Sequence, residues 1–439
     1  MNPKKSFAGL PSKTIIQASF WLAAIAVGFV GILFDKIFHW AQQTYFTLFE
    51  NHTIIFTLCT PILFVCATAV VVFFAPNANG SGIPQALKAM MMSMGSHQTA
   101  MKSGLISLTT AFVKVLSSTI GILAGASIGR EGPTVQISTS LFAWMGSKVK
   151  KKFTHADFHS FLVAGAAAGV SAAFNTPLAG ISFAIEEMAE GSFFQIKQTV
   201  MVSVIIAGIT TQAVLGNYLY FGNPVLTDPG LNIIYPAILM GVIGGTLGGL
   251  FARSLAFPAK YFTKYKWWKQ ALFCGVLCAA VNYLSGGTAA GTGYEITKEF
   301  MESPTGDLPI FLPFIKLFTT MLSYLSGMAG GIFSPSLAVG AGLGVTTAKL
   351  LSLTAVKTCA LLGMVAFFTG VVQAPLTAVI IVMEMTDLHE VIIPLMIAAF
   401  VAQGISKAIM PQSLYHYLAH HRPISPPKEL KWFKKKKHY

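Results

Sequence analysis

Long hydrophobic runs separated by short polar segments are the main pattern of this chain. Asp, Glu, Lys and Arg are absent from residues 53–87, 160–185, 198–227, 231–252, 270–294, 317–348 and 358–383. Because roughly 20 apolar residues cross a bilayer as a helix, about ten or more membrane segments fit. Gly, Pro or Asn interrupts several runs, which predicts broken helices that line a polar cavity.

The composition agrees with this pattern. Of the 439 residues, 54% are hydrophobic and only 10% are charged, which is typical of an all-helical polytopic membrane protein. The five cysteines all lie within apolar runs, where we interpret them as packing residues. We therefore expect no disulfide, no bound metal and no cofactor.

The positive charge of the chain is clustered. The formal net charge is +14, and much of it lies in residues 148–152, 260–269 and 428–437. Nucleic-acid binding is one interpretation, but short basic segments beside apolar spans favour the cytoplasmic side of a membrane. Lys4 and Lys5 precede the first span, so we expect both termini to be cytoplasmic and no cleaved signal peptide.

The second half of the chain repeats features of the first. Lys114 matches Lys316 and Pro133 matches Pro335, each at a separation of 202 residues. Glu186 matches Glu384 at a separation of 198 residues. A duplicated unit of this kind is common in secondary transporters. We predict an N-terminal segment at 1–13, membrane repeats at 14–220 and 221–418, and a basic tail at 419–439.

Two opposite charges interrupt an otherwise uncharged run at Gly129-Arg130-Glu131-Gly132-Pro133. Proline suits the first turn of a helix, so we predict that a helix begins at Pro133. Its free amides and positive dipole end would attract an anion. An acid at membrane depth indicates a functional site, although Glu131 could instead form a structural ion pair with Arg130.

Two further segments have the same character. The repeat makes Gly331-Ile332-Phe333-Ser334-Pro335 the counterpart of the first motif, and Gly80-Ser81-Gly82-Ile83-Pro84 again places proline after small residues. Glycine permits close backbone approach, and the Ser81 hydroxyl can donate a hydrogen bond. We expect helix N-termini to converge on one anion site.

In this order, the three motifs GSGIP, GREGP and GIFSP resemble those of the CLC family of chloride channels and proton-coupled chloride transporters. The resemblance extends through residues 164–188 and 373–387 to about Tyr417. It implies a CLC-type fold with two inverted-repeat halves of tilted and broken helices. It also implies a homodimer in the lipid bilayer that carries chloride and protons, and neither an enzyme nor a nucleic-acid-binding protein.

The resemblance also implies an anion site. Its ligands would be the hydroxyls of Ser81 and Tyr415 and the backbone amides of Ile332 and Phe333. Serine at position 81 resembles the chloride-preferring members, whereas nitrate-preferring members carry proline there. Ser334 stands where some bacterial relatives have alanine, and we expect its hydroxyl to tune the outer site.

Two glutamates take roles by the same resemblance. Glu131 would be the external gate, occupying an anion position when ionised and swinging out when protonated. Glu187 would pass protons between the cytoplasm and Glu131, which favours an H+/Cl− antiporter over a passive voltage- or pH-gated channel. The alternative for Glu187 is a solvated helix end.

Other interpretations remain for several residues. Tyr415 could be an interfacial anchor, and Lys114 and Lys316 could draw anions inward or reach towards water. Residues 125–129 fit the G-x-S-x-G pattern of a serine hydrolase, but no histidine lies in the middle of an apolar run to act as base. The chain ends soon after Tyr415, so we expect no paired nucleotide-binding regulatory domains and a location in a prokaryotic plasma membrane.

Overall fold

The computed structural model describes residues 12–149, 155–188, 198–216, 218–224, 226, 230–257, 266–302, 309–421 and 423–425. Within these ranges the named elements are all helices, which confirms the predicted fold class. Residues 1–11 and 426–439 and most of the three basic clusters lie outside the described residues.

The first half contains the following helices: α1 (Ser12–Asn51), α2 (Thr53–Phe74), α3 (Ile83–Gly95), α4 (His97–Lys102), α5 (Leu108–Leu123), α6 (Glu131–Val149), α7 (His155–Phe174), α8 (Pro177–Phe183) and α9 (Gln198–Leu215). A short 3-10 turn, η1 (Pro76–Ala78), precedes α3, and a π-helical turn, η3 (Ala184–Met188), extends α8.

The second half follows a similar order: η5 (Gly230–Ile233), α10 (Ile234–Ala256), α12 (Trp267–Leu284), α13 (Tyr294–Glu302), α14 (Leu312–Leu325), α15 (Phe333–Leu350), α16 (Val356–Val372), α17 (Pro375–Thr386), α18 (Ile392–Ile409) and α19 (Leu414–His421).

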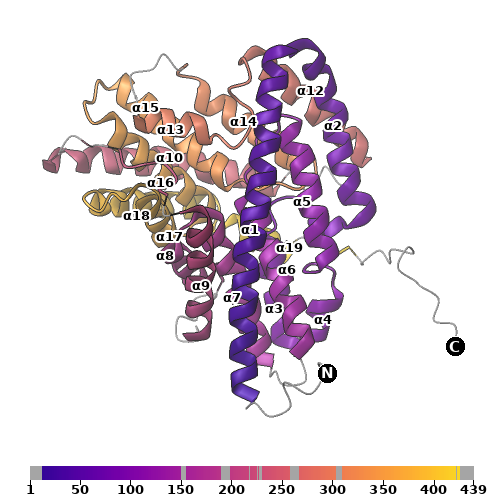
Figure 1. The fold of residues 1–439 in the computed structure, drawn as a ribbon. Helices are drawn as coiled ribbons and strands as arrows, with labels where there is room; N and C mark the ends of the chain where they lie inside the picture. The colour runs from indigo at the N-terminus through magenta and orange to yellow at the C-terminus, as the bar shows by residue number, and fades with distance from the viewer. Residues whose placement is uncertain are drawn as a thin grey trace.

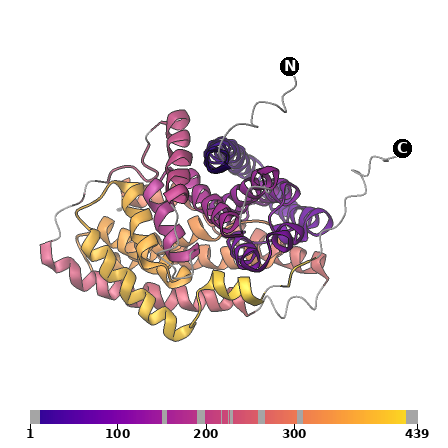
Figure 2. The ribbon, with the colours of Figure 1, turned by 90° about the horizontal axis from the view of Figure 1, so that it is seen from below.

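The helix lengths suit a membrane protein with broken spans. Among the described residues, five helical stretches are long and apolar enough to cross a bilayer, and five apolar helices of 10–17 residues accompany them. In Figure 1, α1 runs along the vertical, whereas α10 and α18 run across it. In the view from below in Figure 2, the indigo and purple helices of the first half gather on one side, and most of the orange and yellow helices of the second half lie on the other. Helix α1 is therefore strongly tilted relative to α10 and α18, which agrees with the predicted fold of tilted helices.

Glycine allows the helices of the second half to approach closely. A Cβ on Gly244 would lie 2.6 Å from the Phe367 amide nitrogen, and one on Gly340 would lie 2.4 Å from the Gly363 carbonyl oxygen. In lipid there is no hydrophobic driving force between helices, so they associate through close van der Waals packing, which small residues permit. This explains why glycines recur at the α10–α16 and α15–α16 contacts, beside the ring pairs Phe251–Phe367 and Phe333–Phe368.

The two halves pack in the same way. Helix α6 packs on α7 as α15 packs on α16, and α1 packs on α9 as α10 packs on α18. Gly129 and Gly331, which the sequence repeat pairs, exchange reciprocal backbone hydrogen bonds of 2.7 and 2.8 Å in an antiparallel bridge. A reciprocal pair between counterpart residues is what a local two-fold relation between halves produces.

A second reciprocal contact supports the same relation. The Glu186 carboxylate accepts from the amides of Leu376 and Thr377 at the start of α17, at 3.2 and 2.7 Å. The Glu384 carboxylate accepts from Leu178 and Ala179 at the start of α8, at 3.1 and 2.9 Å. Each half therefore supplies an acid that caps a helix of the other half, where the dipole favours negative charge.

Removing either cap should destabilise the protein. We expect Glu186→Ala and Glu384→Ala each to cost about 1–3 kcal/mol, because two helix-end amides lose a charged partner. The measurement is the midpoint temperature of unfolding in detergent. Glu390→Ala is the control, since Glu390 is exposed and its loss should change stability by less than about 0.5 kcal/mol. Equal midpoints for all three variants would contradict the capping role.

Candidate ion-transport site

The three sequence motifs meet through their backbones. The Gly80 amide donates to Met328 O at 2.8 Å, and the Gly330 amide donates to Gly80 O at 3.0 Å. Together with the Gly129–Gly331 pair, these bonds join segments that lie up to 250 residues apart in the chain. The predicted convergence of the motifs is confirmed.

Each motif leads into a helix N-terminus. Helix α3 begins at Ile83 after Gly82, whose φ of 109° is a left-handed conformation that glycine adopts readily. Helix α15 begins at Phe333, and its first internal hydrogen bond runs from the Ser336 amide to Ile332 O. The amides before Ser336 therefore have no acceptor inside the helix and can face an anion.

The helix that follows the GREGP motif starts two residues earlier than predicted. Helix α6 begins at Glu131, not at Pro133, and the Thr134 amide donates to Arg130 O at 2.9 Å. Pro133 still lies in the first turn, where a missing amide hydrogen leaves no intrahelical bond unmade. Glu131 therefore projects from the end of the helix.

The Glu131 carboxylate is docked against the start of α15. Its Oε1 accepts a 2.5 Å hydrogen bond from Ser334 Oγ, and its Oε2 accepts from the Ser334 amide at 3.3 Å. The side chain is fully buried. The predicted competition between a carboxylate and an anion for one helix end thus has a matching geometry.

Arg130 does not hold Glu131 in an ion pair. Its guanidinium pairs with Asp35 of α1, donates to Ala173 O at 3.3 Å and lies 5.7 Å from the centre of the Tyr220 ring. The alternative of a structural Arg130–Glu131 pair is wrong, because neighbouring residues at this helix start point in different directions.

Two hydroxyl groups lie beside the meeting point of the helix ends. Ser81 and Tyr415 are both fully buried, and they are neighbours because α19 packs on α3. Apart from their proximity to each other, neither hydroxyl has a hydrogen-bond partner among the described residues. Burial of an unpaired hydroxyl is costly, so the pair suits a ligand that accepts hydrogen bonds. Tyr415 is not an interfacial anchor.

Glu187 occupies a buried π-helical turn. Only 2% of its surface is exposed, and its Oε1 has no hydrogen-bond partner in the part of the chain that the structure describes. His416 Nε2 lies 3.7 Å from that oxygen and 3.1 Å from the Glu187 carbonyl. The solvated-end interpretation is wrong, and π-helical turns occur frequently at functional sites.

The two lysines that the repeat matches donate hydrogen bonds to backbone carbonyls of loops. Lys114 Nζ donates to Gly80 O at 2.8 Å, and Lys316 Nζ donates to Ala289 O, Ala290 O and Gly291 O at 2.6–3.0 Å. Both are buried, so of the two interpretations left open for them, the one in which they reach towards water is wrong. Lys114 fixes the carbonyl directly before Ser81.

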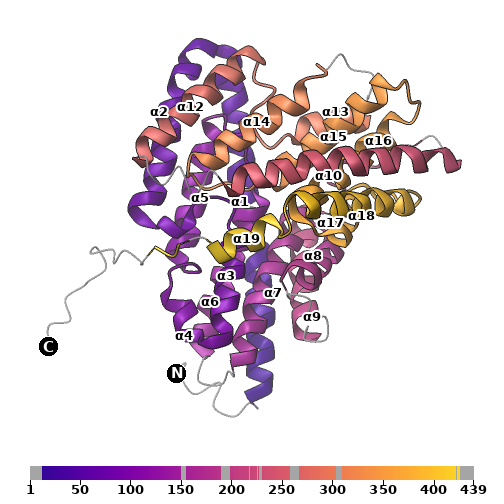
Figure 3. The same ribbon diagram turned by 180° about the vertical axis from the view of Figure 1, so that it is seen from behind.

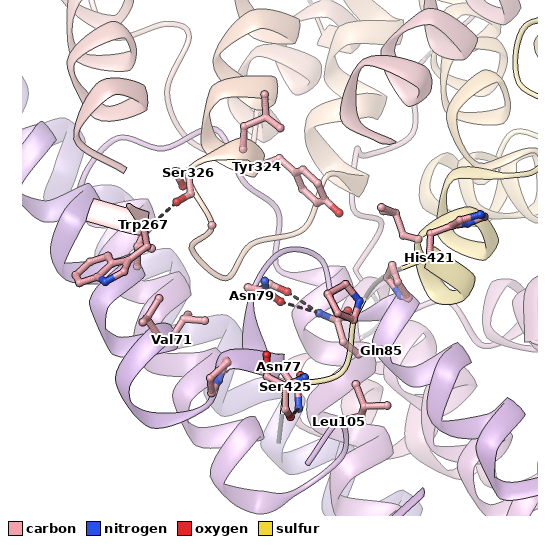
Figure 4. A pocket seen from close by; sticks show the side chains of 18 of the residues that line it. Val71, Asn77, Asn79, Gln85, Leu105, Trp267, Tyr324, Ser326, His421 and Ser425 are labelled. Atoms are coloured by element: carbon pink, nitrogen blue, oxygen red, sulfur yellow. Dashed lines mark hydrogen bonds between the residues drawn. The ribbon is translucent and has the colours of Figure 1, made fainter. Parts of the chain in front are cut away.

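Cavities flank the motifs on two sides. One of about 610 Å³ is lined by Asn79, Gln85, Tyr324 and His421, and by the end of α2, as Figure 4 shows. A second, of about 270 Å³, is lined by Arg130 and by residues of α1 and the segment after α9. Figure 3 shows α19 lying between the two halves, beside α3. Pro84 borders the first cavity and Arg130 borders the second, so each cavity reaches a residue of one motif.

Among the described residues, the hydrogen-bond partners of Ser127 include no base that the hydrolase interpretation requires. The Ser127 hydroxyl shares a 2.8 Å hydrogen bond with the Thr320 hydroxyl, and its amide donates to Ser323 Oγ at 2.9 Å. A second hydroxyl cannot take its proton as a histidine would. Ser127 is better understood as a packing residue between the halves.

Sequence reasoning missed several functional contacts. It did not pair Asp35 with Arg130, did not find the reciprocal caps, and did not connect Ser334 to Glu131. The caps were within reach, because the repeat had already matched Glu186 with Glu384, and Pro177 and Pro375 are separated by the same 198 residues. The Asp35 contact joins separate segments, and nothing in the spacing of the sequence indicates it.

Comparison with known proteins agrees with this geometry. The model of the voltage gated chloride channel family matches residues 62–407. The H(+)/Cl(−) exchange transporter ClcA of Yersinia pestis is 30% identical over 420 residues, which cover 90% of this chain and 85% of that protein. ClcA of Salmonella paratyphi A is 29% identical over 426 residues, covering 92% of this chain and 88% of the relative.

Solved structures share the fold. A slow cyanobacterial Cl−/H+ antiporter aligns with a TM-score of 0.76 at 21% identity, covering 94% of this chain and 98% of that chain. A CLC-type fluoride/proton antiporter aligns with a TM-score of 0.78 at 22% identity, covering 92% and 97%.

Proposed function

The chain belongs to the voltage gated chloride channel family, and on that premise we propose that it exchanges chloride for protons across a membrane. It is a transporter and not an enzyme, and its substrates are the two ions. The observation that carries the proposal is the Glu131 carboxylate docked at the N-terminus of α15, because one group then occupies an anion position and can also carry a proton.

The anion path in this proposal uses few formal charges. Chloride would exchange its water for the hydroxyls of Ser81 and Tyr415 and for the amides of Ile332 and Phe333. The two orphaned hydroxyls and the free amides at the start of α15 support this assignment. Ligands of this kind bind an anion and also release it, which conduction requires.

Coupling follows from competition for one position. Chloride that reaches the start of α15 displaces the Glu131 carboxylate, and the displaced group accepts a proton. For the carboxylate to return to the helix end, it must lose that proton to one side of the membrane and displace the chloride towards the other side, so that the two ions move in opposite directions. Glu187, buried near Tyr415 and His416, would load and unload the proton from the other side.

A passive chloride channel on the same fold is the second candidate. Glu131 can gate an anion path by protonation without fixed stoichiometry. The buried position of Glu187 favours the exchanger, because a buried carboxylate is expensive to retain in a membrane protein unless it has a function.

Transport in liposomes distinguishes the two. Purified protein in chloride-loaded liposomes is given an outward chloride gradient, and external pH and chloride are followed together. We expect chloride efflux to drive protons inward against their gradient. Chloride efflux without linked proton movement would establish the channel and overturn the exchanger.

The membrane setting belongs to the same proposal. We infer a homodimer in a prokaryotic plasma membrane, with both termini cytoplasmic and the repeats dividing at 220/221. Exposed apolar side chains on the surfaces of α8, α9, α17 and α18 support a lipid or partner contact, namely Leu178, Ile209, Leu376 and Ile393. The basic clusters favour cytoplasmic termini.

A further inference from the structure

The shortest contact that Glu131 makes is with a side chain of the other repeat. Ser334 Oγ lies 2.5 Å from Glu131 Oε1, which is the distance of a strong O–H···O− hydrogen bond. Only 6% of Ser334 is exposed, and Glu131 is fully buried. Water therefore competes little for either atom, and the bond is stronger than it would be at a surface.

The two halves of the protein supply different parts of this contact. By the repeat offset, Glu131 corresponds to Phe333 and Gly132 corresponds to Ser334. A Cβ on Gly132 would lie 2.3 Å from Ser81 Oγ, so the first repeat has no room for a side chain there. The second repeat has room, and the side chain it carries reaches the acid.

We propose that the Ser334 hydroxyl is a latch that holds the ionised Glu131 side chain in its docked position and sets the pH at which the anion path opens. This rests on the proposed gating role of Glu131. Ser334 is a positioning residue, because it acts through the carboxylate and carries no proton across the membrane.

The physical reason is the difference between two charge states. An ionised carboxylate accepts the Ser334 proton in a charge-assisted bond, which is roughly twice as strong as a neutral one. After protonation, Glu131 keeps at most a neutral hydrogen bond to the same oxygen. The hydroxyl therefore favours the docked, ionised state, and its loss favours the protonated, released state.

Other ionisable groups near Glu131 do not supply this pH dependence. Those that face it among the described residues are Arg130 beside it, Tyr220 from the segment after α9, and Tyr415 from α19. Arginine and tyrosine side chains keep their charge state between about pH 4 and 8. Asp35 lies behind Arg130, with which it is paired.

The test compares the pH profiles of chloride efflux from liposomes. For Ser334→Ala we expect the pH of half-maximal efflux to rise by about one unit, which corresponds to an approximately tenfold change in the docking equilibrium. The number of protons moved per chloride should stay that of the wild type, because Glu131 remains. Ser334→Thr keeps the hydroxyl and should restore the wild-type profile.

Ser336→Ala is the matched control. Ser336 lies in the same helix turn and is equally buried, but its hydroxyl donates to Ile332 O. Its profile should coincide with that of the wild type. In a Glu131→Ala background the Ser334→Ala change should leave the profile unaltered. An unshifted Ser334→Ala profile, or the same shift without Glu131, would overturn the latch.

A binding measurement separates the latch from the exchange proposal. In detergent at about pH 7.5, calorimetric titration with chloride should show an approximately tenfold higher affinity for Ser334→Ala than for the wild type, because the weakened carboxylate competes less. No gain in affinity would count against the latch whatever the transport result. If the wild type moves chloride without protons, the exchange proposal fails, while a shifted efflux profile still supports the latch.

Discussion

Replacing Glu131 with glutamine or alanine is expected to abolish proton movement while chloride flux continues. The carboxylate lies at the N-terminus of α15, where it occupies an anion position. Either substitution removes the group that, among the described residues at that helix end, can both bind there as an anion and carry a proton. The hydroxyls and amides assigned to chloride remain, so an anion path persists.

The measurement is proton uptake driven by a chloride gradient in liposomes, recorded together with chloride efflux. Proton uptake should fall to the background of protein-free liposomes, and the pH dependence of chloride efflux should flatten. Glu390→Gln is the control, because it removes an exposed carboxylate and should keep full coupling. Sustained proton uptake by the Glu131→Ala variant would show that another group carries the proton.

The sequence alone predicted the helix starts that form this site, because the glycines and prolines of its motifs indicate backbone conformation. Glycine and proline at the ends of apolar runs indicate helix starts inside a membrane, and the repeat indicated that two such starts are related. Both inferences depend on local spacing. The Gly129–Gly331 bridge and the cap that Glu186 makes on α17 are the spatial consequences of that spacing.

The remaining features depend on side-chain directions that spacing does not specify. Arg130 and Glu131 are adjacent in sequence, yet one pairs with Asp35 and the other accepts from Ser334. Lys114 and Lys316 match across the repeat, but each binds carbonyls of a different loop. A pattern predicted which residues are unusual for a membrane segment, and only the packing determined their partners.

Glu187 gives the second large effect. Glu187→Gln is expected to stop proton transport while chloride flux continues, because the amide keeps the size and polarity of the side chain but cannot bind and release a proton. Glu187 is buried, its Oε1 has no hydrogen-bond partner among the described residues, and it lies close to Tyr415. Tyr415 is within electrostatic reach of both Glu187 and Glu131, and the proposed proton path runs between these two acids.

The neighbouring glutamate makes the assignment testable. The Glu186 carboxylate accepts hydrogen bonds from two amides of α17. We therefore assign it to capping this helix and not to proton transfer. Glu186→Gln should lower the midpoint of unfolding and retain wild-type coupling, whereas Glu187→Gln should retain stability and lose coupling. Coupling that survives in the Glu187→Gln variant would remove this residue from the proton path. If instead Glu186→Gln lost coupling and Glu187→Gln lowered the midpoint of unfolding, the roles assigned to the two residues would have to be reversed.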